Sequence, residues 1–298
     1  MSIGRTFRES VQKAYRSLEV GLDGLEPKPA AEGDPDVNRA RSLDMSTLRY
    51  GTSFRLLKVR QALVEGQSIE DVFNVTKIDP WFLNQIKMLV DMNNVETLSN
   101  ASLRNLKHNG FSDRQIGRMI GKKEKEIRAQ RHDESVHPSY KVVDTCAAEF
   151  EAQTPYCYST YDEENEISPL AGKKIMILGS GPNRIGQGIE FDYCCVQAVF
   201  GLKELGYKTI MFNCNQETLS PDVDIVDSLY FAPVTYEDVL NIAEFENPDG
   251  VLVQFGGQTP LKICNALSDA GVQIIGTSPR NIDLAENKNA KYSYVLGS

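Results

Sequence analysis

Residues 175–190 read Ile-Met-Ile-Leu-Gly-Ser-Gly-Pro-Asn-Arg-Ile-Gly-Gln-Gly-Ile-Glu, a short apolar run followed at once by a glycine-rich segment. The apolar run has the length of a buried strand, and a helix is expected from about Gly188 to Leu205. Glycine lets the backbone approach a ligand closely, and a helix start offers free N–H groups to an anion. The stretch therefore predicts a strand, a ligand-facing loop and a helix. A tight turn that serves packing alone is the alternative.

The same alternation continues to the C-terminal side and predicts a parallel α/β sheet. The expected strands are Lys208–Phe212, Leu229–Phe231, Gly250–Gln254 and Gln273–Ile275, and the expected helices are Thr235–Glu246, one from Pro260 and one after Pro279. A second glycine loop precedes Pro260, with Thr259 expected as the helix N-cap. Both loops follow strands, and open α/β sheets bind ligands at the carboxyl ends of their strands. A plain strand-to-helix turn is again the alternative.

The first loop begins like a dinucleotide-binding fingerprint but departs from it. Arg184 stands where the third glycine is needed, and the next strand ends in Asn213 and Asn215 rather than in a ribose-binding carboxylate. An anion or phosphoryl site is therefore favoured over an NAD site. Glu190, Asp192 and Glu217 are expected to face one polar cavity beside Arg184. The candidate residues of the substrate path and phosphate loops are Gly179, Gly181, Asn183, Arg184, Gly186, Gly188, Glu190, Asn215, Glu217, Gly256, Gly257, Gln258 and Thr259.

No complete catalytic set and no metal site are expected. The three histidines, His108, His132 and His137, lack both metal-ligand spacing and a nucleophile partner. A Walker A motif is also missing, because the glycines at 117 and 121 have neither the required spacing nor a Ser or Thr after the lysine.

The N-terminal half carries only helical signals. A capping box at Thr6 and Glu9 opens an amphipathic helix, which is expected to dock on another part of the protein. A linker runs from Glu26 to Pro35, and a small helical domain spans about Asp44 to Arg131. Its internal signals are a periodic stretch from Leu48 to Glu65, N-caps at Ser68 and Asp79, and a capping box at Ser112 and Gln115. The tract Val142–Ile167 has neither helical nor strand period and is expected to be a connector.

A DNA-binding interpretation competes for the helical region. Phe111–Arg131 is compatible with a helix-turn-helix that turns at Gly121. Between Arg104 and Arg131 there are nine Lys or Arg against three Asp or Glu, a local charge of 9 − 3 = +6. Against this interpretation, the whole chain carries a net charge of −9, which repels a phosphate backbone. We therefore expect no nucleic-acid partner.

Length and composition set the remaining limits. The chain has 298 residues, of which 41% are hydrophobic and 24% charged, which is typical of globular proteins of about two domains. The start has no apolar core of a signal peptide, and no apolar run approaches the roughly 20 residues that span a bilayer. We expect a cytoplasmic protein without a membrane partner, in which the six cysteines are reduced and mostly buried.

The loops, taken together, resemble a known family. The run Gly181-Pro-Asn-Arg-Ile-Gly-Gln-Gly-Ile-Glu-Phe-Asp-Tyr-Cys-Cys195 is similar to the large subunit of carbamoyl phosphate synthetase. So are Asp144-Thr-Cys-Ala-Ala-Glu-Phe150, Tyr158-Ser-Thr-Tyr161, Gln254-Phe-Gly-Gly-Gln-Thr-Pro-Leu-Lys262, Gly276-Thr-Ser-Pro279 and the opening Ile3-Gly-Arg-Thr. The likeness covers nearly the whole chain.

The resemblance implies a multidomain α and α/β fold, a small helical oligomerisation domain followed by a Rossmann-like pre-ATP-grasp subdomain. Residues 1–26 resemble the tail of the carboxyphosphate-forming half, and residues 27–165 the oligomerisation domain with its connector. Residues 166–287 resemble the pre-ATP-grasp subdomain of the carbamoyl-phosphate-forming half, and residues 288–298 a remnant that leads toward the ATP-grasp loop. Gln216 departs from the family, which usually has proline there.

The resemblance also implies an activity. The family makes carbamoyl phosphate for pyrimidine and arginine biosynthesis from bicarbonate, two ATP, and ammonia released from glutamine by a glutaminase small subunit. Arg184, Gly188, Glu190 and Glu217 match positions along the route of carbamate. The ATP-grasp lobes, which hold ATP and Mg²⁺, are expected after residue 287 and are absent from the sequence. The chain alone is therefore expected to be an inactive part of this ligase that binds no cofactor tightly and forms homo-oligomers through its helical domain. A non-catalytic assembly module is the alternative.

Overall fold

The computed structural model describes residues 2–26, 44–93, 98–152, 154–181, 187–215 and 225–286. The chain divides into two compact units. The helical unit consists of Ser2–Pro138 and Thr160–Glu163, and the α/β unit consists mainly of Ser139–Ser159 and Glu164–Ser298. Each unit has its own cluster of buried hydrophobic side chains.

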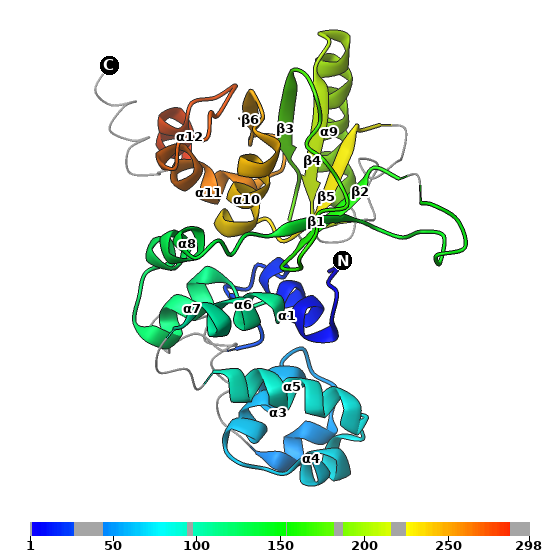
Figure 1. Ribbon diagram of the computed structural model, residues 1–298, viewed down its shortest axis with the longest axis vertical. Coiled ribbons are helices and arrows are strands. Elements are labelled where there is room, and N and C mark those ends of the chain that lie inside the picture. Colours follow the sequence, from blue (N-terminus) through cyan, green and yellow to red (C-terminus); the bar gives the residue numbers. More distant parts are fainter. Residues whose placement is uncertain are drawn as a thin grey trace. The chain divides into compact units, whose positions relative to one another are not determined.

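The helical unit contains short helices throughout its described part (Figure 1). They are α1 (Phe7–Ser17), the 3-10 helix η2 (Met45–Arg49), α3 (Arg55–Val64), α4 (Ile69–Thr76), α5 (Pro80–Met92), α6 (Asn100–His108), α7 (Asp113–Ile120) and α8 (Glu124–Asp133).

Several predicted helix starts are confirmed. The side chains of Ser68, Asp79 and Ser112 each accept a backbone N–H from the first turn of the following helix, and Ser112 with Gln115 forms the full capping box. Thr6 accepts from the Glu9 N–H, but Glu9 Oε2 accepts from Arg5 rather than from Thr6, so that box is only half formed. Polar side chains at these positions satisfy N–H groups that have no partner inside the helix.

The leading helix α1 docks inside the helical unit. Val11 and Tyr15 belong to the same buried cluster as Phe111. Gln12 Oε1 accepts from the Leu25 N–H at 2.6 Å, and Arg16 donates to the Gly110 carbonyl at 2.6 Å. The expected docking of this amphipathic stripe is therefore found on the chain itself.

The periodic stretch Leu48–Glu65 is not one helix. The chain leaves helical geometry between η2 and α3, at Tyr50–Phe54, where Gly51, Thr52 and Ser53 are poor helix formers in succession. Helix α3 then ends before Gly66, whose φ of 88° suits glycine, as predicted. Helices α7 and α8 meet at Gly121, with a φ of 72°, so the helix–turn–helix shape is present.

The α/β unit holds a sheet with the strand order β1-β2-β5-β4-β3-β6. Its strands are β1 (Ser139–Val142), β2 (Tyr156–Thr160), β3 (Lys174–Leu178), β4 (Lys208–Asn213), β5 (Ser228–Phe231) and β6 (Gly250–Leu252). Its helices are α9 (Gln187–Glu204), α10 (Tyr236–Glu246), α11 (Gln258–Asp269) and α12 (Pro279–Glu286). The multidomain α and α/β class is confirmed.

The sheet is parallel at its centre, with β3 paired to β4 on one side and to β6 on the other. The chain leaves β3 toward β4 and β5, then returns through α10 to β6 on the opposite side. The point where the strand order reverses therefore lies between β3 and β6. Ligands of open α/β folds bind at such a point, outside the carboxyl ends of the strands.

Two predictions about this unit were wrong. The tract Val142–Ile167 contains β2, which pairs in parallel with β5, and it begins at the end of β1. The segment Gln273–Ile275 makes only an isolated bridge between Ile274 and Val251. In both cases the segment is held by its neighbours in the sheet, which its own sequence pattern does not show.

All six cysteines are free thiols, and four of them are buried. Within the described ranges, no helix is long and apolar enough to cross a membrane.

Candidate functional site

The two predicted glycine loops meet at the carboxyl ends of β3 and β6. A Cβ atom added to Gly256 would overlap the carbonyl oxygens of Leu178 and Gly179. A Cβ added to Gly179 would lie 3.0 Å from the Phe212 carbonyl oxygen and 3.1 Å from Cγ of Asn213 on β4. Only glycine permits backbones to approach this closely. The sequence thus brings the ends of three strands together at the point where the strand order reverses.

Helix α11 begins earlier than predicted. Gly257, with φ 74° and ψ −153°, occupies the N-cap position, and no side chain caps the helix. Thr259 was therefore wrongly predicted as the N-cap; it and Gln258 lie in the first turn. The glycine conformation turns the chain directly into the helix, and Pro260 is tolerated because the first N–H groups of a helix have no intrahelical partner.

The loop after β4 closes on the same edge. Asn213 Oδ1 accepts from the Asn215 N–H at 2.9 Å, which turns the chain as the strand ends. The Cys214 thiol lies 3.8 Å from the Ser180 carbonyl oxygen, which links this loop to the one after β3. Asn215 directly follows this link in the chain.

The remaining candidates divide into described and undescribed residues. Gly181 follows β3, and Gly188 and Glu190 lie in the first turn of α9. Asn183, Arg184, Gly186 and Glu217 lie outside the described residues, as do Gln216, the linker from residue 27 to 43, and residues 288–298.

The expected sharing of one cavity by Glu190 and Asp192 is not found. Glu190 is exposed, whereas Asp192 is 1% exposed. Residues two apart on a helix point in different directions, so the two carboxyl groups meet different surroundings.

Sequence reasoning missed Gln254, which follows β6. Its Oε1 atom is buried without a hydrogen-bond partner, and its amide lies where a Cβ on Gly276 would be. A buried acceptor without a donor costs free energy unless a ligand or water supplies one. A polar residue placed directly after an apolar strand was the available signal.

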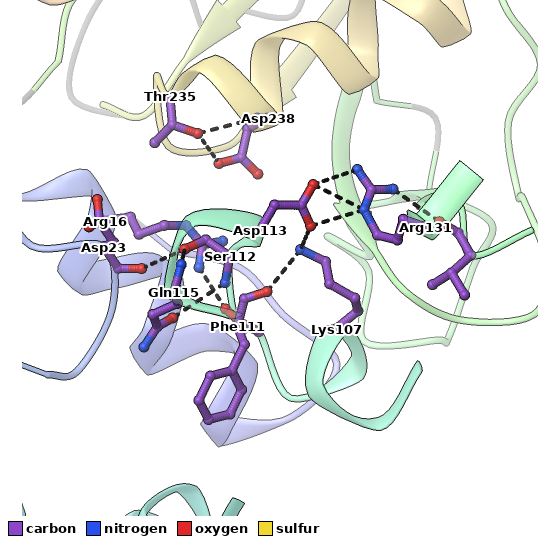
Figure 2. Close-up of polar contacts among 12 residues, drawn as sticks. Arg16, Asp23, Lys107, Phe111, Ser112, Asp113, Gln115, Arg131, Thr235 and Asp238 are labelled. Atoms are coloured by element: carbon purple, nitrogen blue, oxygen red, sulfur yellow. Dashed lines mark hydrogen bonds and ion pairs between the residues drawn. The ribbon is translucent and has the colours of Figure 1, made fainter. Parts of the chain in front are cut away.

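The helical unit contains a buried ion cluster that the sequence did not reveal. Asp113 receives hydrogen bonds from Lys107 Nζ at 2.9 Å and from Arg131 Nη2 at 2.9 Å (Figure 2). The three side chains are at most 1% exposed. Lys107 also donates to the Phe111 carbonyl and Arg131 to the Val136 carbonyl.

The ring of Tyr161 completes this cluster, with its centroid 4.8 Å from Lys107 Nζ and 5.5 Å from Arg131 Cζ. Burial by itself raises the pKa of Asp113, but the charges of Lys107 and Arg131 outweigh it, so the pKa is held below its ordinary value. Asp113 is therefore ionised at neutral pH, and its hydrogen bonds tie α6, α7 and α8 together.

The same cluster bears on the DNA-binding interpretation. Two of the nine basic residues between 104 and 131, Lys107 and Arg131, are buried in ion pairs with Asp113. Arg118 pairs with Asp23 and Glu26 at 2.7 Å each, and Arg114 with Asp23 at 3.6 Å. Four of the nine basic side chains are thus paired with carboxylates, whereas phosphate binding needs cations that can reach the backbone.

Comparison with domain families fits both units. Residues 171–284 match the model described as the carbamoyl phosphate synthase preATP-grasp domain. Residues 1–135 match the carbamoyl-phosphate synthetase large chain oligomerisation domain. The class of protein is thus a preATP-grasp domain joined to a helical oligomerisation domain.

Curated relatives narrow the class further. The chain is 54% identical over 294 residues to the carbamoyl phosphate synthase large chain of Pseudomonas aeruginosa, and 50% identical over 299 residues to that of Archaeoglobus fulgidus. Each match covers 97% of this chain and 27% of the relative. The chain belongs to the family of carbamoyl phosphate synthase large chains and spans about a quarter of the length of the relatives it matches, so the predicted resemblance is confirmed.

Proposed function

We propose that this chain is part of a large chain that takes part in carbamoyl phosphate synthesis. Its helical unit joins subunits, and the glycine loops of its α/β unit bind a ligand. Residues 166–287 are assigned to the half that phosphorylates carbamate, and residues 27–165 to oligomerisation with a connector. The observation that carries this proposal is the close approach of Gly256 to the Leu178 and Gly179 carbonyls, because it sets two glycine loops at the sheet's ligand-binding point. The assignment of residues 1–26 to a preceding half stays a prediction.

The proposed ligand of this edge is carbamate, an anion. N–H groups at the start of α9 attract negative charge, and the guanidinium of Arg184 matches a carboxylate in shape and charge. Gly188, Glu190 and Glu217 are assigned to the same route. Glu190 lies exposed in the first turn of α9, which suits a residue that a ligand must reach.

ATP and Mg²⁺ are the proposed cofactors of the reaction, and a glutaminase subunit in the cytoplasm is the proposed source of ammonia. Phosphoryl transfer depends on positioning and on cationic stabilisation of the transferred group. Among the described residues, no group of three or more His, Cys, Asp or Glu side chains could hold a metal ion. We expect no turnover by the chain alone, because the two domains that it matches span only about a quarter of the relatives' length.

The test is the reverse reaction, in which ATP is formed from ADP and carbamoyl phosphate with Mg²⁺. The chain alone should give no ATP above the blank, and ATP production would overturn the assignment of a dependent part. Within a full-length large chain, Glu190→Gln should lower carbamoyl phosphate output while glutamine hydrolysis stays largely intact. Glu204→Gln, at the exposed far end of the same helix, is the matched control. Equal losses of both activities in Glu190→Gln would contradict the proposed route.

The second candidate is a non-catalytic assembly module, which the match of residues 1–135 to an oligomerisation domain favours. The native mass of the purified chain tests it. A mass above 33.2 kDa that rises with concentration is expected, and a monomer at every concentration would contradict self-association.

A further inference from the structure

A cavity of about 350 Å³ lies within the helical unit. Helix α6 lines it with Arg104, Asn105 and His108, and the stretch directly after β2 lines it with Tyr161–Glu163. The volume is at the small end of the range for pockets that bind small molecules. The cavity belongs to a different unit from the two glycine loops, so the proposed carbamate route does not account for it.

Arg104 brings a guanidinium to the cavity, and the protein fixes its orientation. Its Nε donates to Asn100 Oδ1 at 2.9 Å, and its Nη2 donates to the Ser135 carbonyl at 3.0 Å. Its Nη1 has no partner among the described residues. The same holds for the amide nitrogen of Asn105, whose Oδ1 accepts from Asn109. Helix α6 thus supplies free N–H donors and a positive charge, which suit a carboxylate.

Glu163 brings a carboxylate to the same cavity. No described residue pairs with this carboxylate, which lies at an exposed position. The neighbouring Asp162 is engaged, since its Oδ1 accepts from the Glu163 N–H at 3.0 Å and its Oδ2 lies 3.6 Å from Arg5 Nε. Within the described structure, Arg104 and Glu163 form no ion pair with one another. A ligand that carries both a cation and an anion can satisfy both of these charges.

His108 connects the two parts of the wall and adds an acceptor. Its Nδ1 lies 3.1 Å from the Tyr161 carbonyl oxygen, and because a carbonyl only accepts, Nδ1 carries the proton. In the neutral ring Nε2 is then an acceptor, and no described residue donates to it. An ammonium group has three N–H donors, so it can bind His108 Nε2 and a carboxylate together.

Val136 and Tyr161 give the cavity an apolar part. The Val136 carbonyl accepts from Arg131, and the Tyr161 ring centroid lies 4.8 Å from Lys107 Nζ. Both lining residues are therefore held by the buried ion cluster of the helical unit. A wall that is ordered before binding loses less conformational entropy when a ligand arrives.

We propose that this cavity binds a free α-amino acid in its zwitterionic form. The ligand's carboxylate pairs with Arg104 and the amide of Asn105, and its ammonium group with Glu163 and His108 Nε2. The ligand's side chain contacts Val136. A nucleotide fits less well, because its phosphates carry only negative charge and are repelled by the unpaired Glu163.

The histidines of the chain report on this cavity, because two of the three, His108 and His137, line it. Imidazole ring signals of the chain, made with isotope-labelled histidine, are followed by NMR while the protein L-amino acids are added one at a time. At least one amino acid should shift these signals to saturation, with a Kd of roughly 0.1–10 mM. The indole signal of Trp81, which lies outside the cavity, should not move. Failure of every amino acid to shift the signals would overturn the proposal.

Paired analogues test the two charges of the ligand. For L-valine they are L-α-hydroxyisovalerate, which lacks the ammonium group, and isobutylamine, which lacks the carboxylate. The corresponding hydroxy acid and amine are used for any other amino acid that binds. Each analogue should have a Kd about tenfold higher or more, because it leaves one charge of the cavity without a partner. Equal binding of the hydroxy acid would indicate an anion site, and equal binding of the amine a cation site. Either result would contradict a zwitterion site.

Substitutions test the residues that are assigned to the ligand. Glu163→Gln should raise Kd by about tenfold, whereas Glu164→Gln, at an exposed position that does not line the cavity, should leave Kd unchanged. Arg104→Gln should weaken binding to a similar degree, with Arg114→Gln in α7 as its matched control. Far-UV circular dichroism checks that the variants fold. If Arg104→Gln does not fold, because it also loses the bond to Ser135, Glu163→Gln carries the test, since it removes no side-chain contact among the described residues. An unchanged Kd in Glu163→Gln would refute the assigned site.

Discussion

At the scale of single residues, Asp113 neutralises two buried cations in the helical unit. Replacing it by asparagine leaves Lys107 and Arg131 buried without their counter-charge, which costs about 3–5 kcal/mol for a buried pair that loses one partner. Asp113→Asn should therefore lower the free energy of unfolding of this unit by about that amount, measured by urea titration with Trp81 emission. Asp91→Asn breaks only the exposed pair with Lys87 and should cost less than about 1 kcal/mol.

The stability of the helical unit should depend on pH, because the pKa of Asp113 is lowered in the folded chain. The Asp113 carboxyl binds its proton less readily in the folded chain than in the unfolded chain. Its contribution to the free energy of unfolding is therefore complete above the ordinary aspartate pKa of about 4. That contribution is lost as the pH falls through the pKa that Asp113 has in the folded chain. The urea midpoint of the helical unit should drop in acid, and the drop should be smaller in Asp113→Asn. An identical pH profile in the two proteins would show that other groups govern the acid transition.

In the α/β unit, Gly256 is a position where one added methyl group is expected to destabilise the fold. A methyl group at this position meets the Leu178 and Gly179 carbonyl oxygens, which cannot move without separating the two loops. Gly256→Ala should lower the free energy of unfolding by about 1–3 kcal/mol, as overpacking does elsewhere, and should lower the melting temperature. Gly201→Ala in α9, with open space around the added Cβ, should instead stabilise by about 0.5–1 kcal/mol.

At the scale of elements, α10 and α11 make a matched pair because one has a side-chain cap and the other does not. Thr235 Oγ1 accepts from the Asp238 N–H at 3.2 Å, whereas α11 begins at Gly257. Thr235→Val should cost about 1 kcal/mol of unfolding free energy and Thr259→Val less than about 0.5, measured by urea titration. Equal costs would mean that Thr259 does cap α11.

Elements with a clear period or cap could be predicted from the sequence, and those held by neighbours could not. The runs at Ile175 and Lys208 are long and apolar enough to be strands by themselves, and Ser112 and Gln115 satisfy one another locally. Strand β2 is held between β1 and β5 in the sheet, and the sequence of the connector does not encode these neighbours locally.

The same distinction applies to the candidate site. Glycine-rich loops after apolar runs predicted where the strand ends meet. The actual start of α11, the burial of Asp192 and the buried acceptor of Gln254 depend on packing between segments far apart in sequence. The cluster around Asp113 was missed for the same reason, since Lys and Arg are buried only where a folded partner neutralises them.

At the scale of the whole molecule, each unit contains side chains whose signals can follow its unfolding separately. Trp81 lies in the helical unit, and all six cysteines lie in the α/β unit. Burial raises the pKa of the Cys157 thiol to about 11 and that of Cys195 to about 12, so both react slowly while folded. Cys194 is exposed and Cys146 is half-buried, so these two thiols should react quickly with a thiol-labelling reagent even in the folded chain.

Because the buried clusters of the two units share no residue, we expect the units to unfold separately. In a urea titration of the whole chain, Asp113→Asn should shift the midpoint seen by Trp81 emission and leave the midpoint of thiol labelling in place. Gly256→Ala should do the reverse. Each variant serves as the control for the other, since each reporter is native to one unit. If either substitution moves both midpoints equally, the chain unfolds as one cooperative body, and the separate cores do not act as independent folding units.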